Sequence, residues 1–383
     1  MRTALILLLA CLASSLAAQR TCAVQRLPSL VPQYTASVSA REVAVLPVVV
    51  HIVWHTPAEN ISDTQVESQI EVLNQDFRAL NVEVPDIHPV FDALAADVEI
   101  EFCLTAITRT QTPWEGVSNL FAQGKRRVCH TELGGRDAID PAHYINIWVA
   151  GRSDGTLGSA TFPEEAQDKP AEDGLFLRPD VFGTQGSTSP PFNLGRTCTH
   201  EMGHYLNLGH LWGSGADNFD CEQDDGIEDT PRQADNYRNT CPSVPPFSCG
   251  SADMFMNYMN YTDDACMALF TPGQKARMWG ALMEFRSGLL QSSCAPVASA
   301  PALDHAPPRL LGNPVKNVAH LQLSEKEKYE IAIFDAAGRL VLLTRHHGGG
   351  LLGIDLSGLA AGIYHIKVKY GAHLHLKKLI IAQ

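Results

Sequence analysis

The sequence predicts an α+β protein in two folded parts: a larger domain with a twisted mixed sheet, helices and a loop-rich lower half, and a small all-β sandwich. Up to about residue 290, β-branched runs alternate with segments of helical period. Residues 212–252 are rich in Asp, Pro, Gly and Cys, which favours loops. Beyond a Pro/Ala stretch, short runs of alternating apolar and polar residues with Gly-containing turns continue to the end, as in a small β module.

The larger domain opens with a β-branched run at Val43–Trp54 that is long enough for a buried strand. Ser62 and Asp63 then form an N-cap signal, and apolar residues recur every three to four positions after it, which predicts a core-facing helix. The remaining elements are expected as three strands and two helices: Val98–Ile107, Tyr144–Ala150 and Leu157–Phe162, then Thr197–Gly209 and Thr271–Leu290.

The charge of the chain excludes one class of partner. There are 29 Lys and Arg against 42 Asp and Glu, a net charge of −13 at pH 7. A nucleic-acid partner is not expected, because neutralising phosphates requires a basic face. Residues 309–383 carry ten basic and five acidic side chains, a net of +5 that leaves −18 for the rest. This contrast predicts a domain boundary near residue 300.

The N-terminus has the order of a cleaved secretory signal. Arg2 precedes an apolar run at Ala4–Leu12, and small residues follow up to Ala18. A short buried helix is the alternative. The run is too short to span a bilayer and no other stretch is long enough, so no membrane span is expected in the mature protein. The chain then divides into a signal, a leader, the larger domain, a linker and a C-terminal module: 1–18, 19–42, 43–294, 295–308 and 309–383.

The segment His200–His210 reads H-E-M-G-H-Y-L-N-L-G-H and carries the chemistry. His200 and His204 lie four residues apart, so both imidazoles point to one side of a helix, and neutral imidazole is a preferred zinc ligand. His210 can supply a third ligand if the chain turns sharply after the second. Asn207 and Gly209 permit that turn because both tolerate left-handed backbone angles.

Glu201 lies beside the first of these histidines, where its carboxylate can take a proton from a water whose pKa the zinc lowers. A helix that merely contains histidines is the alternative, but this motif with a third histidine at the right offset is rare by chance. A structural zinc site would usually be closed by a fourth protein ligand. The pattern therefore predicts catalytic zinc.

H-E-x-x-H-x-x-G-x-x-H followed by a methionine turn marks the metzincin metallopeptidases, and the chain resembles their pappalysin family. The resemblance covers about residues 43–290 and is carried by these stretches: G-R-T-C-T-H-E-M-G-H-Y-L, I-N-I-W-V-A, L-G-S-A-T-F-P, I-E-D-T-P and N-Y-M-N-Y-T-D-D-A-C-M. Asn207 departs from the usual glycine, yet asparagine is the next most tolerant residue of a positive φ. The resemblance implies a metzincin-like zinc peptidase fold and protein or peptide substrates.

The resemblance also implies roles in the methionine turn, which lies within residues 251–270. Met259 would form an apolar floor beneath the metal. Tyr261, two residues later, would donate a hydrogen bond to the oxygen that becomes negatively charged during the reaction. A packing role for Tyr261 is the alternative.

An acidic segment at Cys221–Pro231, C-E-Q-D-D-G-I-E-D-T-P, groups carboxylates around a glycine. Carboxylate and carbonyl oxygens suit a hard cation. By position, the family resemblance implies a calcium ion held by four residues of this segment: Asp224, Asp225, Glu228 and Thr230. The alternative is a solvated acidic loop.

An exported chain folds in an oxidising environment, so its ten cysteines indicate disulfides. Cys11 leaves with the signal, and an odd number, nine, remains. The family spacing implies Cys221–Cys249 and Cys241–Cys266, although sequence alone leaves three pairings of these four open. Cys103–Cys129 is expected as a third bridge, and Cys198 and Cys294 as a weaker fourth pair.

Cys22, in the leader, is the odd cysteine. A thiolate is a good fourth zinc ligand, and this arrangement resembles the cysteine-switch latency of several metzincins. Cys22 is therefore expected to hold the zymogen inactive. A disulfide with Cys198 or Cys294 is the alternative.

The last 75 residues resemble the C-terminal sorting domain of the type IX secretion system. Four landmarks carry the resemblance: Asn313-Pro314, Gly338-Arg339, Gly362-Ile363-Tyr364 and Lys377-Lys378. The residue pattern alone indicates a small β-sandwich, and a carbohydrate-binding or surface-binding module is the alternative. The resemblance implies a Gram-negative source, export by that machinery and an extracellular or cell-surface location.

We interpret the chain as a secreted zinc endopeptidase that binds its substrate extended along an edge strand, Leu157–Phe162, by β-augmentation. The alternative is a non-catalytic adhesive protein that uses zinc structurally. The presence of Glu201 beside an open ligand position argues against it.

Overall fold

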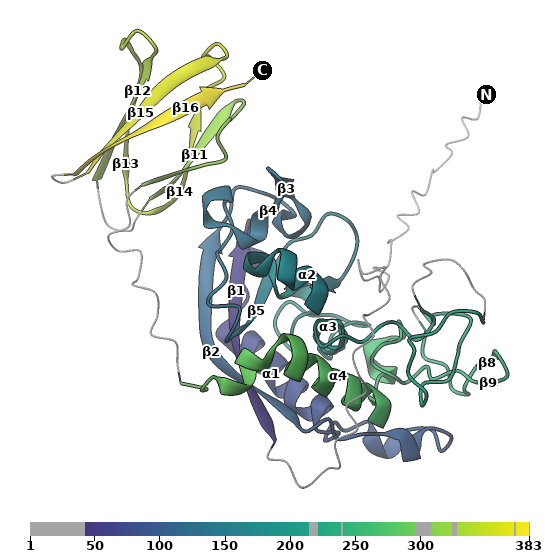
Figure 1. Ribbon diagram of the computed structural model, residues 1–383. Coiled ribbons are helices and arrows are strands. Elements are labelled where there is room, and N and C mark those ends of the chain that lie inside the picture. Colours follow the sequence, from purple (N-terminus) through teal and green to yellow (C-terminus); the bar gives the residue numbers. More distant parts are fainter. Residues whose placement is uncertain are drawn as a thin grey trace, which may run out of the picture.

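The structure is a computed structural model that describes residues 43–213, 221–238, 240–295, 308–323, 328–370 and 373–382. The expected signal, the leader with Cys22 and most of the expected linker lie outside the described residues. Figure 1 shows the mixed-sheet domain and, above it, an all-β sandwich at the C-terminal end. Within the described ranges, no helix combines the length and the apolar character needed to cross a membrane.

The larger domain is built on a five-stranded mixed sheet in the order β2-β1-β5-β7-β6. Its strands are β1 (Ala44–Trp54), β2 (Ile100–Gln111), β5 (Ile145–Ala150), β6 (Gly158–Ala160) and β7 (Leu175–Leu177). The first three and β7 run parallel, and β6 pairs antiparallel with β7. The predicted mixed sheet is thereby confirmed, and β6 lies at its edge.

The central strand shows why the opening run is apolar throughout. β1 pairs with β2 on one side and β5 on the other, and Leu46–Val53 is buried without interruption. Helix α1 (Asp63–Phe77) packs on β2. Ser62 caps it, since its side chain accepts a hydrogen bond from Gln65 N at 3.1 Å.

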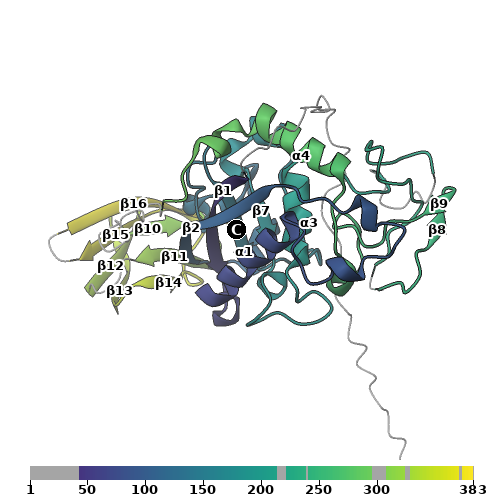
Figure 2. The same cartoon turned by 90° about the horizontal axis from the view of Figure 1, so that it is seen from below.

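Three further helices belong to this domain: α2 (Pro163–Asp168), α3 (Arg196–Tyr205) and α4 (Pro272–Phe285). α4 begins with a capping box formed by Thr271 and Gln274. The described residues of this domain also form several short 3₁₀ helices and two short hairpins: β3 (Phe121–Ala122) with β4 (Lys125–Arg126), and β8 (Phe247–Ser248) with β9 (Ser251–Ala252). β8 and β9 lie at the end of the molecule away from the sandwich (Figures 1 and 2).

The loop-rich lower half is stapled by disulfides. Cys221 is bonded to Cys249 and Cys241 to Cys266, which are the two pairs that the family resemblance implied. Between α3 and α4, the described residues otherwise hold the β8–β9 hairpin, one short turn of 3₁₀ helix and loops. Such a segment has little core of its own, and the cross-links restrict its unfolded states.

The expected Cys103–Cys129 bridge is wrong. Cys103 is bonded to Cys294 instead, and Cys129 is a buried free cysteine. Cys103 lies opposite Pro47 on β1, whereas Cys129 packs in the cluster that contains Val53, six residues further along that strand. Six strand residues span about 20 Å, far beyond the ~7 Å between Cα atoms that a disulfide allows. The pairing of Cys198 with Cys294 is excluded by the same bond.

The C-terminal sandwich has its own hydrophobic core between two antiparallel sheets. One sheet has the order β10-β11-β14: Arg309–Leu311, Val318–Leu323 and Gly350–Asp355. The other has the order β13-β12-β15-β16: Leu340–His347, Lys328–Asp335, Gly362–Tyr370 and His373–Ile381. The predicted all-β module is confirmed.

Candidate active site

Helix α3 carries the histidine motif and is held in place by a buried ion pair. Arg196, at its first turn, forms salt bridges with Asp76 of α1 and with Glu83. Thr199 Oγ1 donates a hydrogen bond to Asp76 Oδ2 at 2.6 Å. Burial raises the pKa of Asp76 to about 6, while the Arg196 charge opposes that rise. Two side chains of α3 thus meet one carboxylate, which fixes the rotation of the helix.

The helix ends where the sequence expects a turn. Asn207 has φ 72°, in the left-handed region, and Leu208 N donates to Gly203 O while Asn207 N donates to His204 O. These two bonds define a Schellman motif with asparagine at the left-handed position. The turn directs the chain back, so that His210 meets the two helical histidines.

The three histidines converge on one point. Their Nε2 atoms lie 3.1 Å apart for His200 and His204, 3.1 Å for His204 and His210, and 3.3 Å for His210 and His200. A tetrahedral ion with zinc–nitrogen bonds of about 2.0–2.1 Å requires nitrogens about 3.3 Å apart. The spacing of the three nitrogens therefore fits a zinc ion.

The tautomers favour the same conclusion. His200 Nδ1 donates to the Tyr258 carbonyl and His204 Nδ1 to the Leu208 carbonyl, each at 2.7 Å. Donation from Nδ1 leaves the lone pair on Nε2, which is the form that binds a metal. Burial lowers the pKa of His204 to about 4 and that of His210 well below its usual value, where the neighbouring histidines add to the effect. Without a cation, converging lone pairs would repel one another.

Met259 lies directly under α3. It is fully buried, and a Cβ placed on Gly203 would lie 2.4 Å from its Sδ atom. Only glycine at position 203 leaves room for this close packing. Asn257 Oδ1 accepts hydrogen bonds from Met259 N at 2.9 Å and from Gln274 Nε2 at 3.0 Å, which pins the methionine turn to the start of α4.

Glu201 lies on the same helix, against the edge strand. A Cβ on Gly158 of β6 would lie 2.8 Å from Glu201 Oε1. The carboxylate thus meets the backbone of β6, on the side of α3 that faces the sheet. Any side chain at position 158 would collide with it.

Tyr261 packs beside the histidines. Its ring centroid lies 4.9 Å from that of His210 and 5.6 Å from that of His200. Trp212 stacks on His210 at 4.7 Å with 5° between the planes, and it meets Tyr261 edge-on at 4.8 Å. The Arg238 guanidinium lies over the Tyr261 ring at 5.2 Å. Trp212 therefore packs against both the third histidine and Tyr261 and holds them together.

Sequence reasoning missed Trp212, Arg238 and the glycines at 158 and 203. Trp212 follows the motif by two residues, and an aromatic residue there is the one local signal that could have been used. Arg238 lies 28 residues beyond His210, and its approach depends on how the lower loops fold.

The structure brings only some of the expected calcium ligands of the acidic segment together. Asp225 Oδ1 accepts hydrogen bonds from Ile227 N at 3.0 Å and from Thr230 Oγ1 at 2.7 Å, whereas its Oδ2 is buried without a partner among the described residues. Burial raises the pKa of Asp225 to about 7. Asp224 pairs with Arg232 at 2.8 Å, and Glu228 is exposed. Only Asp225 and Thr230 of the four expected residues are in direct contact.

In the described part of the chain, two groups of three His, Cys, Asp or Glu side chains lie close enough to share an ion. One is the histidine triad and the other is His130, Glu132 and Asp137. His130 already bonds Glu172 at 3.1 Å and Glu132 pairs with Lys125, also at 3.1 Å. The triad is buried and lies next to a carboxylate, which is the arrangement expected of the metal centre of a zinc metallopeptidase.

Comparison with known proteins agrees with this class. Residues 133–283 match the family of M43 peptidases described as "Pregnancy-associated plasma protein-A", and residues 311–382 match the "Secretion system C-terminal sorting domain". An extracellular metalloprotease of Arthroderma benhamiae is 30% identical over 298 residues, 73% of this chain and 96% of that protein. An extracellular metalloprotease of Arthroderma otae is 28% identical over 302 residues, again 73% and 96%.

Solved structures are similar as well. Mature mirolysin of Tannerella forsythia in complex with a cleaved peptide is 42% identical, with a TM-score of 0.60 over 66% of this chain and 95% of that one. A mutant of promirolysin from the same organism is 41% identical, with a TM-score of 0.59 over 66% and 85%. The chain belongs to the pappalysin (M43) family of metallopeptidases, and it is a secreted zinc metallopeptidase.

Proposed function

We propose that His200, His204 and His210 hold the zinc ion and that Glu201 is the general base of peptide-bond hydrolysis. The observation that carries this proposal is the convergence of three Nε2 lone pairs next to one carboxylate. When bound, zinc polarises the scissile carbonyl and lowers the pKa of water. Glu201 accepts the proton of the attacking water and then donates it to the leaving amine.

Tyr261 is proposed to donate a hydrogen bond to the carbonyl oxygen as it gains negative charge. Its contact with two of the zinc-binding histidines supports this role. Met259 is proposed as the apolar floor of the site, as in metzincins of the pappalysin type. A Tyr261→Phe variant would then lose about 10²-fold in kcat while KM changes little.

The edge strand β6 is proposed to bind the substrate. Its outer edge has no partner strand in the sheet order, and Gly158 of β6 touches Glu201. An extended peptide that adds to this edge would pass the zinc site directly. The cleaved peptide bound by mature mirolysin supports protein or peptide substrates for this chain too.

A calcium ion is proposed at Asp225. Its buried Oδ2 atom has no partner among the described residues, and an unpaired buried carboxylate oxygen is costly unless a cation meets it. Thr230 would help to hold Asp225, and Asp224 and Glu228 would complete the site from the same loop.

Cys22 is proposed to keep the zymogen latent, and the state of the other cysteines supports this proposal. Cys294 is bonded to Cys103, and the free cysteines of the described residues, Cys129 and Cys198, are both buried. A leader cysteine therefore meets no accessible thiol in the described part of the chain. Its thiolate is proposed to bind the zinc in the zymogen.

The C-terminal module, 309–383, is proposed to act as a sorting signal that directs the protein through the type IX machinery to the surface or medium of a Gram-negative bacterium. The match to secretion sorting domains supports this role. In this proposal, residues 1–18 are the signal, 19–42 the leader, 43–294 the peptidase domain and 295–308 the linker.

The proposed mechanism is tested by measuring casein cleavage and zinc content on the same protein, with and without a chelator. Removal of zinc should abolish cleavage, and readdition of zinc should restore it. Cleavage that survives complete zinc removal would refute the assignment and favour another catalytic group.

A further inference from the structure

The outward face of the sheet β13-β12-β15-β16 exposes leucines. Side chains of these strands that point inward form the sandwich core, as Ile331, Ile333 and Ile366 do. Outward positions of such a sheet are normally polar. Here Leu343, Leu374 and Leu376 are 51%, 58% and 62% exposed.

These leucines belong to neighbouring rows of the same face. Leu343 pairs with Ala332, Ala332 with Lys367, and Lys367 with Leu376, which forms one row across all four strands. In the next row, Lys369 pairs with Leu374. The exposed fractions are those of the whole chain, so the peptidase domain does not cover these leucines.

The same face is strongly basic. Five cationic side chains share the outward positions with the leucines: Lys328, Arg345, Lys367, Lys369 and Lys378. Glu330 is the one acidic residue at the described outward positions of the four strands, and Arg345 pairs with it at 3.2 Å. The face is therefore apolar in part and carries an excess of positive charge.

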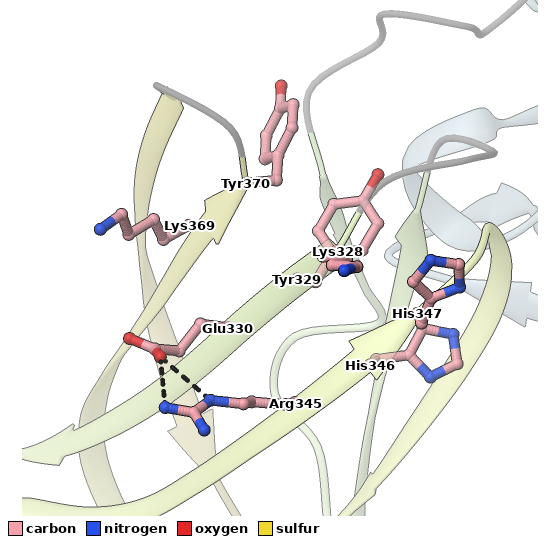
Figure 3. Close-up of a pocket in the computed structure, with 8 residues that line it drawn as sticks. All are labelled: Lys328, Tyr329, Glu330, Arg345, His346, His347, Lys369 and Tyr370. Carbon is pink, nitrogen blue, oxygen red and sulfur yellow. Dashed lines mark hydrogen bonds and ion pairs between the residues drawn. The ribbon is translucent and has the colours of Figure 1, made fainter.

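One end of this face forms a hollow of about 490 Å³ (Figure 3). Lys328 and Glu330 come from β12, Arg345 and His347 from β13, and Lys369 from β15. Tyr329 and Tyr370 also border the hollow, but both belong to the buried core of the sandwich, where their ring centroids lie 5.3 Å apart. A carboxylate on a partner would meet several cations there.

We propose that this leucine–lysine face is the surface by which the secretion machinery recognises the C-terminal module, and that the partner is a protein surface with an apolar centre and a border of carboxylates. The inference rests on the proposed sorting function of the module. Charge complementarity requires an acidic partner, and exposed apolar patches mark interaction sites.

The size of the face indicates how strong a contact it can make. The outward positions of β12, at Lys328, Glu330, Ala332 and Phe334, mark four rows of the face. Four strands at about 4.8 Å spacing and four rows at about 6.8 Å spacing give a footprint on the order of 300 Å². Stable complexes cover roughly 800 Å² on each partner. A contact of this size is weak and short-lived, as suits a signal that is read and then released.

The test is export of the full-length protein in a host that carries the type IX machinery. Two double variants alter the face, Leu374→Ser with Leu376→Ser, and Lys367→Glu with Lys369→Glu. The control is Val318→Ser with Lys316→Glu, which makes the same kinds of change in the other sheet. Val318 is the first residue of β11, Lys316 lies two residues before it, and both are exposed. A chain that ends at Pro308 measures the sorting function itself. Thermal unfolding and casein cleavage report whether each variant folds.

Both face variants should lower the exported fraction by about tenfold, since each removes apolar or charged contacts. The control should export as the wild type does. The proposal is overturned if folded face variants export normally, or if the control fails as severely as they do. Export of the chain that ends at Pro308 would instead refute the sorting function.

An anionic membrane is the competing occupant of the face. Sedimentation of the full-length protein with vesicles of phosphatidylcholine and 30% phosphatidylglycerol separates the two. Loss of vesicle binding by face variants that export normally would assign the face to lipid and overturn the proposal.

Discussion

Replacing Gly203 by alanine introduces one methyl group between α3 and the methionine turn. The new Cβ would lie 2.4 Å from Met259 Sδ and 3.3 Å from its Cε, whereas non-bonded carbon and sulfur atoms prefer about 3.5–4.0 Å. Met259 is fully buried, so it cannot swing into solvent. The methionine turn must therefore move by roughly 1 Å.

The magnitude follows from two opposing effects. Overpacking a core costs about 1–3 kcal/mol, and alanine in place of glycine within a helix returns up to about 1 kcal/mol. The net loss of about 1–2 kcal/mol lowers Tm by roughly 2–8 °C for a domain of this size. Movement of the turn also shifts the Tyr258 carbonyl that orients His200, which should weaken zinc binding about 10- to 100-fold.

The assay is a double-mutant cycle by thermal unfolding, with zinc affinity measured by chelator competition. Met259→Ala creates space, so the Gly203→Ala, Met259→Ala double variant should be less destabilised than the two single changes added together, by about 1–3 kcal/mol. Gly358→Ala serves as the control, because no atom lies within 4 Å of a Cβ there. Additive single effects, or an unchanged Tm for Gly203→Ala, would refute the packing argument.

Three other predictions concern acid stability, calcium and latency. Burial lowers the pKa of His51 to about 4 from 6.5, so its contribution to stability is complete above pH 6.5 and is lost as the pH falls toward 4. The Tm of His51→Gln should therefore fall less steeply than that of the wild type between pH 6.5 and 4. An equal slope of Tm against pH in the two proteins would contradict this. Calcium at millimolar concentration should raise the Tm of the wild type and leave the Tm of Asp225→Asn unchanged. Equal calcium-induced shifts in Tm for the two proteins would show that Asp225 is not part of the site. The Cys22→Ala precursor should cleave casein or process itself faster than the wild type, whereas an equally inert precursor, or Cys22 found in a disulfide, would end the cysteine-switch proposal.

The main strands of the sheet could be predicted because their apolar runs are long. β1, β2 and β5 each have at least six residues, and the period of two or the continuous apolar run is clear over that length. β7 was missed because Leu175–Leu177 is too short for any period to show. The helix that carries the zinc motif ends at Tyr205 rather than near Gly209, since the left-handed Asn207 breaks it earlier.

The histidine triad could be predicted because its spacing is local to one helix and one turn. Contacts between distant segments could not. The positions of Trp212 against Tyr261 and of Gly158 against Glu201 depend on how separate elements pack. The wrong partner for Cys103 has the same cause, because sequence spacing does not report a separation of about 20 Å along β1.

The central claim is that Glu201 performs proton transfer while the three histidines alone hold the zinc. The most direct test measures zinc content and kcat/KM on one preparation of Glu201→Ala. The variant should retain one zinc per chain and lose at least about 10²-fold in kcat/KM, the usual contribution of a general base. Retention of more than a few per cent of the wild-type activity, or loss of the zinc together with the carboxylate, would contradict the account.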